Sequence, residues 1–180
     1  MAVLTLSLDD ARYPPNLRER MGDDAPAQLA ALGNLDLLAL PKIGLFSSVR
    51  CPGHVILTTY DQAAKWRDAG RCVISGFHSP VEKECLRILL RGPQPIIICP
   101  ARAIEAMRIP IELRTAFDAG RVLYLSPFAK QPRRVTKESA LRRNETVAAL
   151  ADEAYVAHVA AGGQTALISK MLAQWGVLLV

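Results

Sequence analysis

From residue 42 onward, short apolar runs alternate with segments of helical pattern, and this alternation constrains the fold more than any other feature. The runs are apolar throughout rather than at every second position, which indicates a sheet buried on both faces. Alternation with helices of this length indicates right-handed βαβ units and a parallel sheet. We therefore predict a Rossmann-like three-layer α/β/α sandwich with a mostly parallel sheet. The predicted strands are 42–46, 71–75, 95–99, 121–125, 153–159 and 176–180, and the predicted helices are 57–69, 80–91, 110–119, 137–151 and 165–175.

Residues 1–40 have a different pattern. Turn signals stand at Pro14-Pro15 and Pro26, and Gly33-Asn34 precedes a short apolar turn. We predict an extended and partly helical N-terminal lead-in, packed on a Rossmann-like domain formed by residues 41–180.

Composition limits the class of protein. The 180 residues contain 22 Lys+Arg and 17 Asp+Glu, a net charge of +5, which favours an anionic partner without demanding one. The N-terminus lacks the pattern of a secretory signal, and no apolar run approaches the ~18 residues of a membrane span. We expect a soluble, cytoplasmic protein.

Cysteines and histidines give no sign of a metal site. Cys51, Cys72, Cys85 and Cys99 form no CxxC pair, and we expect neither a disulfide nor a bound metal. The histidines His54, His78 and His158 share no ligand spacing. His78 follows a predicted strand, where it could stack on a base or donate to phosphate, although an incidental surface position is the simpler interpretation.

Three turns that follow predicted strands are candidates for binding an anion. The carboxyl ends of parallel strands form the usual ligand crevice, and the N–H groups at helix N-termini favour phosphate. Glycine and serine are also what tight turns use, so a single turn proves little. Three at one sheet edge favour a binding crevice. The candidate residues are Ser47, Ser48 and Arg50 in the first turn, Ser75, Gly76 and His78 in the second, and Gly162, Gly163 and Thr165 in the third.

The stretch 130–145 is the densest basic segment. Arginines can contact phosphate with two hydrogen bonds, and Asn144 can contact phosphate or base edges. The alternative is a solvated loop and helix face. Consecutive residues on one helix cannot all point outward, so at least one of Arg142, Arg143 and Asn144 should face the crevice or a neighbour. The candidate binding residues of this stretch are Arg133, Arg134, Arg142, Arg143 and Asn144.

These segments, in this order, resemble the DNA-processing protein A family (DprA, also called Smf). The likeness covers nearly the whole chain and rests on Tyr13-Pro14-Pro15-x-Leu17, Ser75-Gly76, Arg143-Asn144 and the turn "GGQTALI". The resemblance implies a protein that binds single-stranded DNA, self-associates as a homodimer, helps to load a recombinase, and has neither a catalytic step nor a cofactor. Members often continue with a further strand and a C-terminal helical domain, which we expect this chain to lack.

The chain also departs from the family pattern. The loop "SGFHSPVEKE" has Ser79 and Pro80 where the family has Arg and Gly, and Glu82 where it has Asp. Glu145 replaces the second arginine of the Arg-Asn-Arg motif. We interpret the loop as a weakened anion turn.

Enzymatic alternatives find little support. Phosphoribohydrolases of similar fold carry Gly-Gly-x-Gly-Thr-x-x-Glu, whereas "GGQTALIS" lacks the third glycine and the glutamate. Neither a GxGxxG turn nor a P-loop is present. We predict a DprA-like protein that binds single-stranded DNA through a basic crevice in DNA uptake or recombination. The alternative is a degenerate Rossmann-like nucleotide-binding or sensor module without a DNA-processing role, and a phosphoribohydrolase-type enzyme is less favoured.

Overall fold

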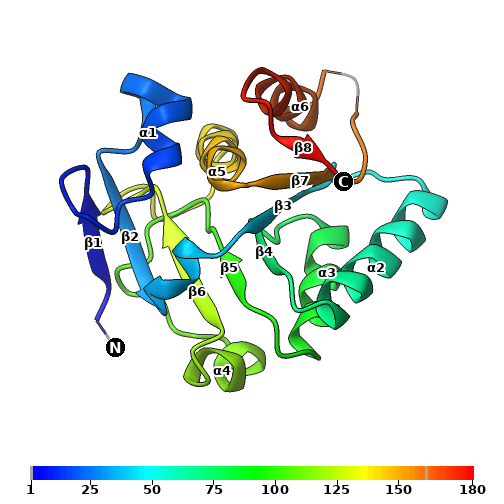
Figure 1. The fold of residues 1–180 in the computed structure, drawn as a ribbon, viewed down its shortest axis with the longest axis horizontal. Helices are drawn as coiled ribbons and strands as arrows, with labels where there is room; N and C mark the ends of the chain where they lie inside the picture. Colours follow the sequence, from blue (N-terminus) through cyan, green and yellow to red (C-terminus); the bar gives the residue numbers. More distant parts are fainter. Residues whose placement is uncertain (1, 161) are drawn as a thin grey trace.

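The structure, a computed structural model, describes residues 2–160 and 162–180, within which eight strands form one sheet between two helical layers (Figure 1). The predicted Rossmann-like architecture is confirmed. In chain order the elements are β1 (Leu4–Ser7), α1 (Pro15–Met21), η1 (Gly22–Asp24), β2 (Gln28–Gly33), η2 (Leu35–Ala39), β3 (Lys42–Phe46), α2 (Gly53–Asp68), β4 (Cys72–Ser75), α3 (Pro80–Leu90), β5 (Ile96–Ile98), α4 (Ile111–Asp118), β6 (Val122–Ser126), α5 (Lys137–Leu150), β7 (Glu153–Val156), α6 (Gln164–Gln174) and β8 (Leu178–Leu179).

The strand order, β1-β2-β6-β5-β4-β3-β7-β8, shows a doubly wound sheet. From β3 the chain adds β4, β5 and β6 on one side, then crosses over and adds β7 and β8 on the other. Every pairing between two strands of the set β3 to β8 is parallel. The order therefore reverses between β3 and β7, and the loops that follow these two strands diverge at their carboxyl ends.

Residues 1–40 contribute strands that the sequence analysis did not predict. Strand β2 pairs antiparallel with β6, from Ala30 opposite Ser126 to Gly33 opposite Leu123, and β1 pairs antiparallel with β2. The β2 segment "QLAALG" is rich in alanine and lacks β-branched residues, so its sequence gives a weak strand signal. The backbone hydrogen bonds to β6 stabilise the extended conformation that the local sequence favours only weakly.

Helix α1 of this N-terminal segment is tied to the end of α5. The side chain of Arg20 donates to the carbonyl oxygens of Ala149 at 2.9 Å and Ala151 at 2.6 Å, and Asn16 Nδ2 donates to Leu150 O at 3.2 Å. The last carbonyls of a helix have no partner within it, so these side chains satisfy groups that the helix leaves free. The N-terminal segment is therefore attached to the rest of the fold at two places, through the pairing of β2 with β6 and through the contacts of α1 with the end of α5.

Several predicted boundaries move. Helix α2 begins at Gly53, four residues before the predicted start, because Pro52 holds the extended backbone before a helix and the chain turns directly after it. Strand β7 ends at Val156 rather than at residue 159, and β8 contains only Leu178 and Leu179. Thr136 is the N-cap of α5, and its side chain accepts a hydrogen bond from Ser139 N at 3.1 Å.

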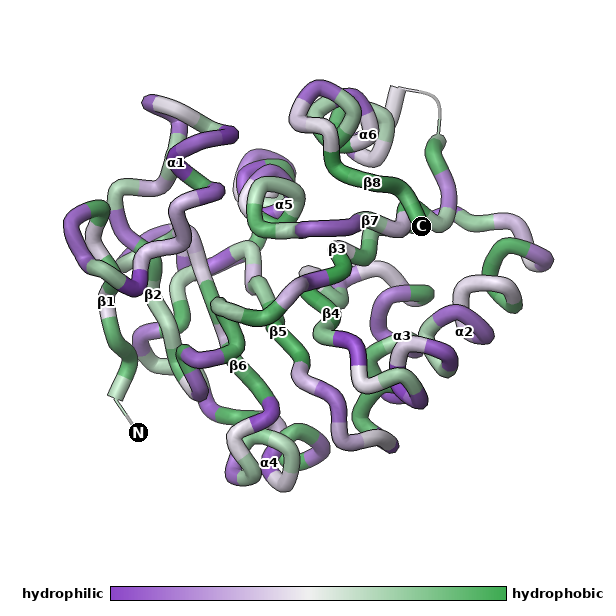
Figure 2. The backbone as a smooth tube through the Cα atoms, in the orientation of Figure 1, coloured by the Kyte–Doolittle hydropathy of each residue, from purple (hydrophilic) through white to green (hydrophobic). Residues whose placement is uncertain are grey.

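Apolar side chains fill both faces of the sheet, as the continuous apolar runs require. In Figure 2 the central strands β4, β5 and β6 are coloured mainly as hydrophobic. Adjacent strand residues separate between the faces: Ile74 and Ile97 pack in the cluster with α5 and α6, while Val73 and Ile96 pack in the cluster with α2, α3 and α4. None of the helices in residues 2–160 and 162–180 combines the length and the apolar character that spanning a membrane requires.

Candidate functional site

A cavity of about 400 Å³ opens where the loops after β3 and β7 diverge, at the switch point of the sheet. In doubly wound folds this is the position where ligands bind. The first and third predicted turns meet here, together with Asn144 of α5. The sequence analysis did not identify Val49, Ala160 and Gln164, whose only signal is proximity to those turns. The lining residues are Ser47, Ser48, Val49, Arg50, Asn144, Ala160, Gly163, Gln164 and Thr165. We call this cavity the crevice.

The hydroxyl of Ser48 joins the two walls of the crevice. It donates to His158 O at 3.0 Å and accepts from Ala160 N at 3.2 Å. Thr165 Oγ1 lies 2.8 Å from it and must be the donor, because the single hydroxyl hydrogen of Ser48 is already used. Ser48 and Thr165 therefore position the loops, while Arg50 is exposed at the mouth.

The amide of Asn144 faces the start of α6. Its Nδ2 donates to Gln164 Oε1 at 3.4 Å, and Gln164 Nε2 donates to Lys137 O at 3.0 Å. Gly163 is the N-cap of α6, and Gly162 before it has φ +69°. Nothing lies within 4 Å of a Cβ placed on Gly162, so this glycine is required by the backbone conformation of the turn.

The second predicted turn, Ser75-Gly76, already holds an anion that belongs to the chain. The carboxylate of Glu82 accepts from Ser47 N at 2.9 Å, from His78 N at 2.8 Å and from Ser79 N at 3.2 Å. Phe77 N donates to Ser75 Oγ at 3.2 Å. The N–H groups that the sequence analysis assigned to a ligand phosphate thus donate to side chains of the protein.

Arg143 lies behind this turn. Its side chain is buried, with 4% of the residue exposed, and Nη1 donates to Cys99 O at 3.1 Å. A Cβ on Gly76 would meet this Nη1 at 1.4 Å, so the guanidinium occupies the space that the glycine leaves. Burial lowers the pKa of Arg143, and the negative charge of Glu82 opposes that effect.

Arg142 points to another side of α5. It donates to Asp24 O and forms an ion pair with Glu145, with 3.6 Å between Nη1 and Oε2. Successive residues on a helix are separated by about 100°, so neighbouring arginines face different surroundings. The expectation that at least one residue of this trio faces a neighbour is confirmed, and Arg142 does not line the crevice.

Arg133 lines a second cavity, of about 260 Å³, beyond the carboxyl ends of β5 and β6. Arg102 and Lys130 line it as well, together with Glu105 and Met107. Ala103 N donates to Pro132 O at 2.9 Å and holds the two loops together. Arg134 is exposed on the same loop. The sequence analysis missed Arg102, although its place just after a strand was the signal used for the other turns.

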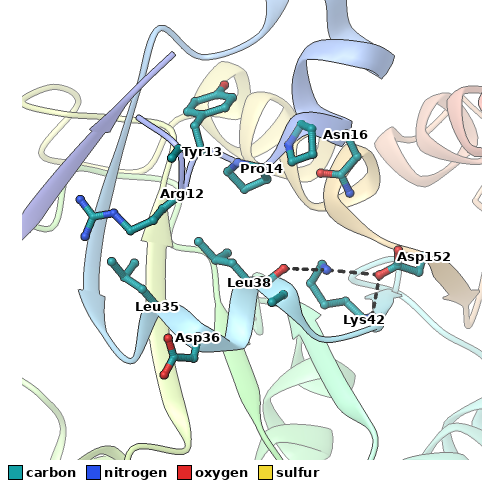
Figure 3. Close-up of a pocket in the computed structure, with 12 residues that line it drawn as sticks. Arg12, Tyr13, Pro14, Asn16, Leu35, Asp36, Leu38, Lys42 and Asp152 are labelled. Atoms are coloured by element: carbon teal, nitrogen blue, oxygen red, sulfur yellow. Dashed lines mark hydrogen bonds and ion pairs between the residues drawn. The ribbon is translucent and has the colours of Figure 1, made fainter. Parts of the chain in front are cut away.

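Another cavity, of about 530 Å³, lies at the opposite end of the strands, and none of the predicted site residues line it (Figure 3). Lys42 at the start of β3 forms part of its wall. Its Nζ donates to Leu38 O at 3.2 Å and Leu40 O at 2.6 Å, and lies 3.2 Å from Asp152. This lysine connects η2 to the loop before β7, so its charge is balanced by Asp152 and by backbone carbonyls of the protein.

In the ranges 2–160 and 162–180, no cluster of three or more His, Cys, Asp or Glu side chains could hold a metal ion. All four cysteines are free. The carbonyl oxygen of Cys99 accepts the hydrogen bond from Arg143. Burial raises the pKa of the Cys99 thiol to about 12, so this thiol remains protonated at neutral pH.

A doubly wound sheet with a crevice at its switch point defines the class of Rossmann-like α/β proteins. More particularly, the chain belongs to the DNA recombination-mediator protein A family, whose sequence model matches residues 4–174. No curated protein sequence matches it.

Solved structures share the fold, among them two DNA processing proteins. DNA processing protein A from Streptococcus pneumoniae superposes with a TM-score of 0.80 at 20% identity, covering 98% of this chain and 62% of that one. DNA processing protein A from Helicobacter pylori, reported for its single-stranded DNA binding mode, has a TM-score of 0.75 at 18% identity, covering 98% and 79%. The chain thus spans less than two thirds of the pneumococcal protein.

Proposed function

We propose that this protein binds single-stranded DNA along the carboxyl edge of its sheet and acts in DNA recombination. The observation that carries the proposal is the placement of the crevice and the second cavity. Both lie at the carboxyl ends of the parallel strands, one beside β3 and β7 and the other beside β5 and β6. Membership of the family and the similarity to the H. pylori protein support single-stranded DNA as the ligand.

The charges at this edge suit a phosphate backbone. Arg50 stands at the crevice mouth, while Arg102, Lys130 and Arg133 line the second cavity. Cations that neutralise phosphates release counterions, which produces affinity that falls with salt. In the crevice the amides of Asn144 and Gln164 can donate to phosphate or base edges.

Val49 adds an apolar contact at the crevice. The residue is 71% exposed, and it lines the crevice together with Ser48 and Arg50. An exposed apolar side chain at a binding site can pack against an unstacked base. In this proposal Ser75, Gly76 and Arg143 support the crevice from behind and do not contact the ligand.

We propose binding without a chemical step. The described residues that line the crevice carry hydroxyl, amide and guanidinium groups, and none of them carries a carboxylate or an imidazole. General acid–base catalysis normally uses one of those groups. Pairing of two copies and contact with a recombinase are further expectations from the family, and sedimentation of the purified chain, alone and with a recombinase, tests them.

A second candidate is a module that binds one nucleotide. The volume of the crevice, about 400 Å³, and the negative charge of Glu82, which accepts from Ser47 N at the crevice wall, favour it. Glu145, in place of the family's second arginine, also reduces the positive charge available for DNA. A single nucleotide makes few phosphate contacts, so its affinity would vary only slightly with salt.

Fluorescence anisotropy of labelled single-stranded and duplex oligonucleotides at several salt concentrations separates the two candidates. We expect preference for the single strand and a steep salt dependence. Arg50→Ala should weaken binding and reduce the slope of log K against log salt by about 0.7, the value for one single-strand phosphate contact. Arg87→Ala is the control, because Arg87 is 73% exposed on α3 and pairs with Glu84. Absence of binding at low salt would refute the DNA role, and mononucleotide binding with a shallow slope would favour the second candidate.

A further inference from the structure

We propose that Glu82 determines the specificity of the site by filling a phosphate cradle with its own carboxylate. The cradle consists of the N–H groups of Ser47, His78 and Ser79. The inference deepens the proposed function and rests on it for the identity of the ligand. Without the Glu82 carboxylate, the turn after β4 would accept a phosphate.

The hydrogen bonds of Glu82 go beyond helix capping. A capping box explains the bond from Ser79 N, because Ser79 is the N-cap of α3 and Glu82 its third residue. It does not explain the bond from Ser47 N, which comes from the loop after β3 and is 2.9 Å long. The two carboxylate oxygens collect donors from two neighbouring strand ends, as a bound anion does.

Arg143 supplies the positive charge that such a cradle needs. It lines a small cavity of about 80 Å³ together with His78, Ser79 and Glu82. Its Nε is buried and has no hydrogen-bond partner among the described atoms. A cation beside several convergent N–H groups is the usual composition of a phosphate site. The anion that completes it here is Glu82, which is buried with 7% exposed.

The position of Glu82 directs a ligand elsewhere. The small cavity and the crevice share Ser47, Val49, Asn144 and Gln164 as lining residues. A phosphate in the crevice therefore lies beside a carboxylate that repels a second phosphate from the cradle. This arrangement makes the turns after β3 and β7 the place where ligand phosphates bind.

The test compares wild-type protein with Glu82→Gln, which keeps the size of the side chain but loses its charge and half of its acceptor capacity. The probe is inorganic phosphate, followed through the amide NMR signals of Ser47, His78 and Ser79. We expect no response of these signals in the wild type and a saturable shift in Glu82→Gln. The thermal midpoint of the variant should rise with phosphate, because a ligand that binds only the folded state stabilises it. With single-stranded DNA, the salt slope of the variant should steepen by about 0.7.

Glu84→Gln is the matched control, since it removes the same charge from the same helix at a residue paired with Arg87. It should behave as the wild type. Equal amide shifts in wild type and Glu82→Gln would overturn the inference, and so would silent amides in a folded Glu82→Gln. Folding of Glu82→Gln only in the presence of phosphate would support the inference. Failure of this variant to fold even with phosphate present would refute it. DNA anisotropy of the wild type remains a separate test, so loss of the DNA role and loss of the cradle are distinguishable.

Discussion

The guanidinium of Arg143 occupies the place of a side chain on Gly76: a Cβ there would lie 1.4 Å from Arg143 Nη1. The two residues are distant in the sequence, one in the turn after β4 and the other in the middle of α5. Because the arginine also donates to Cys99 O after β5, it connects three elements beneath the carboxyl edge of the sheet. The glycine is retained here for close packing with a protein side chain.

Gly76→Ala should therefore destabilise the fold. The methyl group would displace a buried guanidinium from its hydrogen bond, and overpacking of this kind costs about 1–3 kcal/mol. Urea denaturation measures the loss. Gly53→Ala is the control, because nothing lies within 4 Å of a Cβ at Gly53. The cost should be smaller in an Arg143→Ala background, where the clashing atoms are absent; equal costs in both backgrounds would contradict the proposed contact.

Thr165→Val should loosen the crevice. The variant keeps the shape of the side chain but loses the hydrogen bond of 2.8 Å to Ser48, which is worth about 1 kcal/mol. We expect lower stability in chemical denaturation and weaker binding of single-stranded DNA in anisotropy. Thr58→Val serves as the control, since the Thr58 hydroxyl donates only to His54 O on the exposed side of α2. Matching losses in the two variants would show that the bond between the crevice walls has no special role.

Arg133→Ala should weaken DNA binding through charge rather than through folding. Arg133 is exposed, so its removal should leave the unfolding transition unchanged while the salt slope decreases by about 0.7. Arg91→Ala, an exposed arginine at the C-cap of α3, is the control. An unchanged slope for Arg133→Ala would remove the second cavity from the DNA path.

The thiols should differ sharply in reactivity. Burial raises the pKa of Cys72, Cys85 and Cys99 to about 12, whereas Cys51 is only partly buried and its pKa is raised less. With a thiol reagent at about pH 8, Cys51 should react first and the other three only after unfolding. Rapid reaction of all four thiols in the native protein would contradict the buried positions.

The same shifts predict a loss of stability in alkali. The folded pKa values lie above the ordinary value of 9.0, so unfolded thiols ionise at lower pH than native ones. The unfolded state then binds fewer protons, and the free energy of unfolding falls as the pH rises above 9.0. Denaturation of a Cys99→Ala variant across this range should show a smaller dependence on pH.

Local sequence patterns specified the α/β architecture and placed most of the candidate crevice residues at one edge of the sheet. Strand β3 has the predicted bounds, 42–46, because a strand buried on both faces must be apolar at every position. The cap at Thr136 is also local information, since a side chain and an N–H group three residues away suffice. Ser47, Ser48, Arg50, Asn144, Gly163 and Thr165 meet in one crevice because parallel strands end at one edge.

The partners of the polar groups follow from the folded chain and not from local sequence. Strand β2 forms because it pairs with β6, and its sequence of alanines and leucines does not predict that pairing. Arg142 and Arg143 are indistinguishable in the sequence, yet Arg142 donates to Asp24 O whereas Arg143 is buried against Gly76. They differ because the rotation of a helix about its axis depends on what packs against it. Glu82 reads as a capping residue, and only the folded chain brings Ser47 N, 35 residues away, to its carboxylate. Local patterns specify elements, whereas the partner of a buried charge depends on which distant segments the fold brings together.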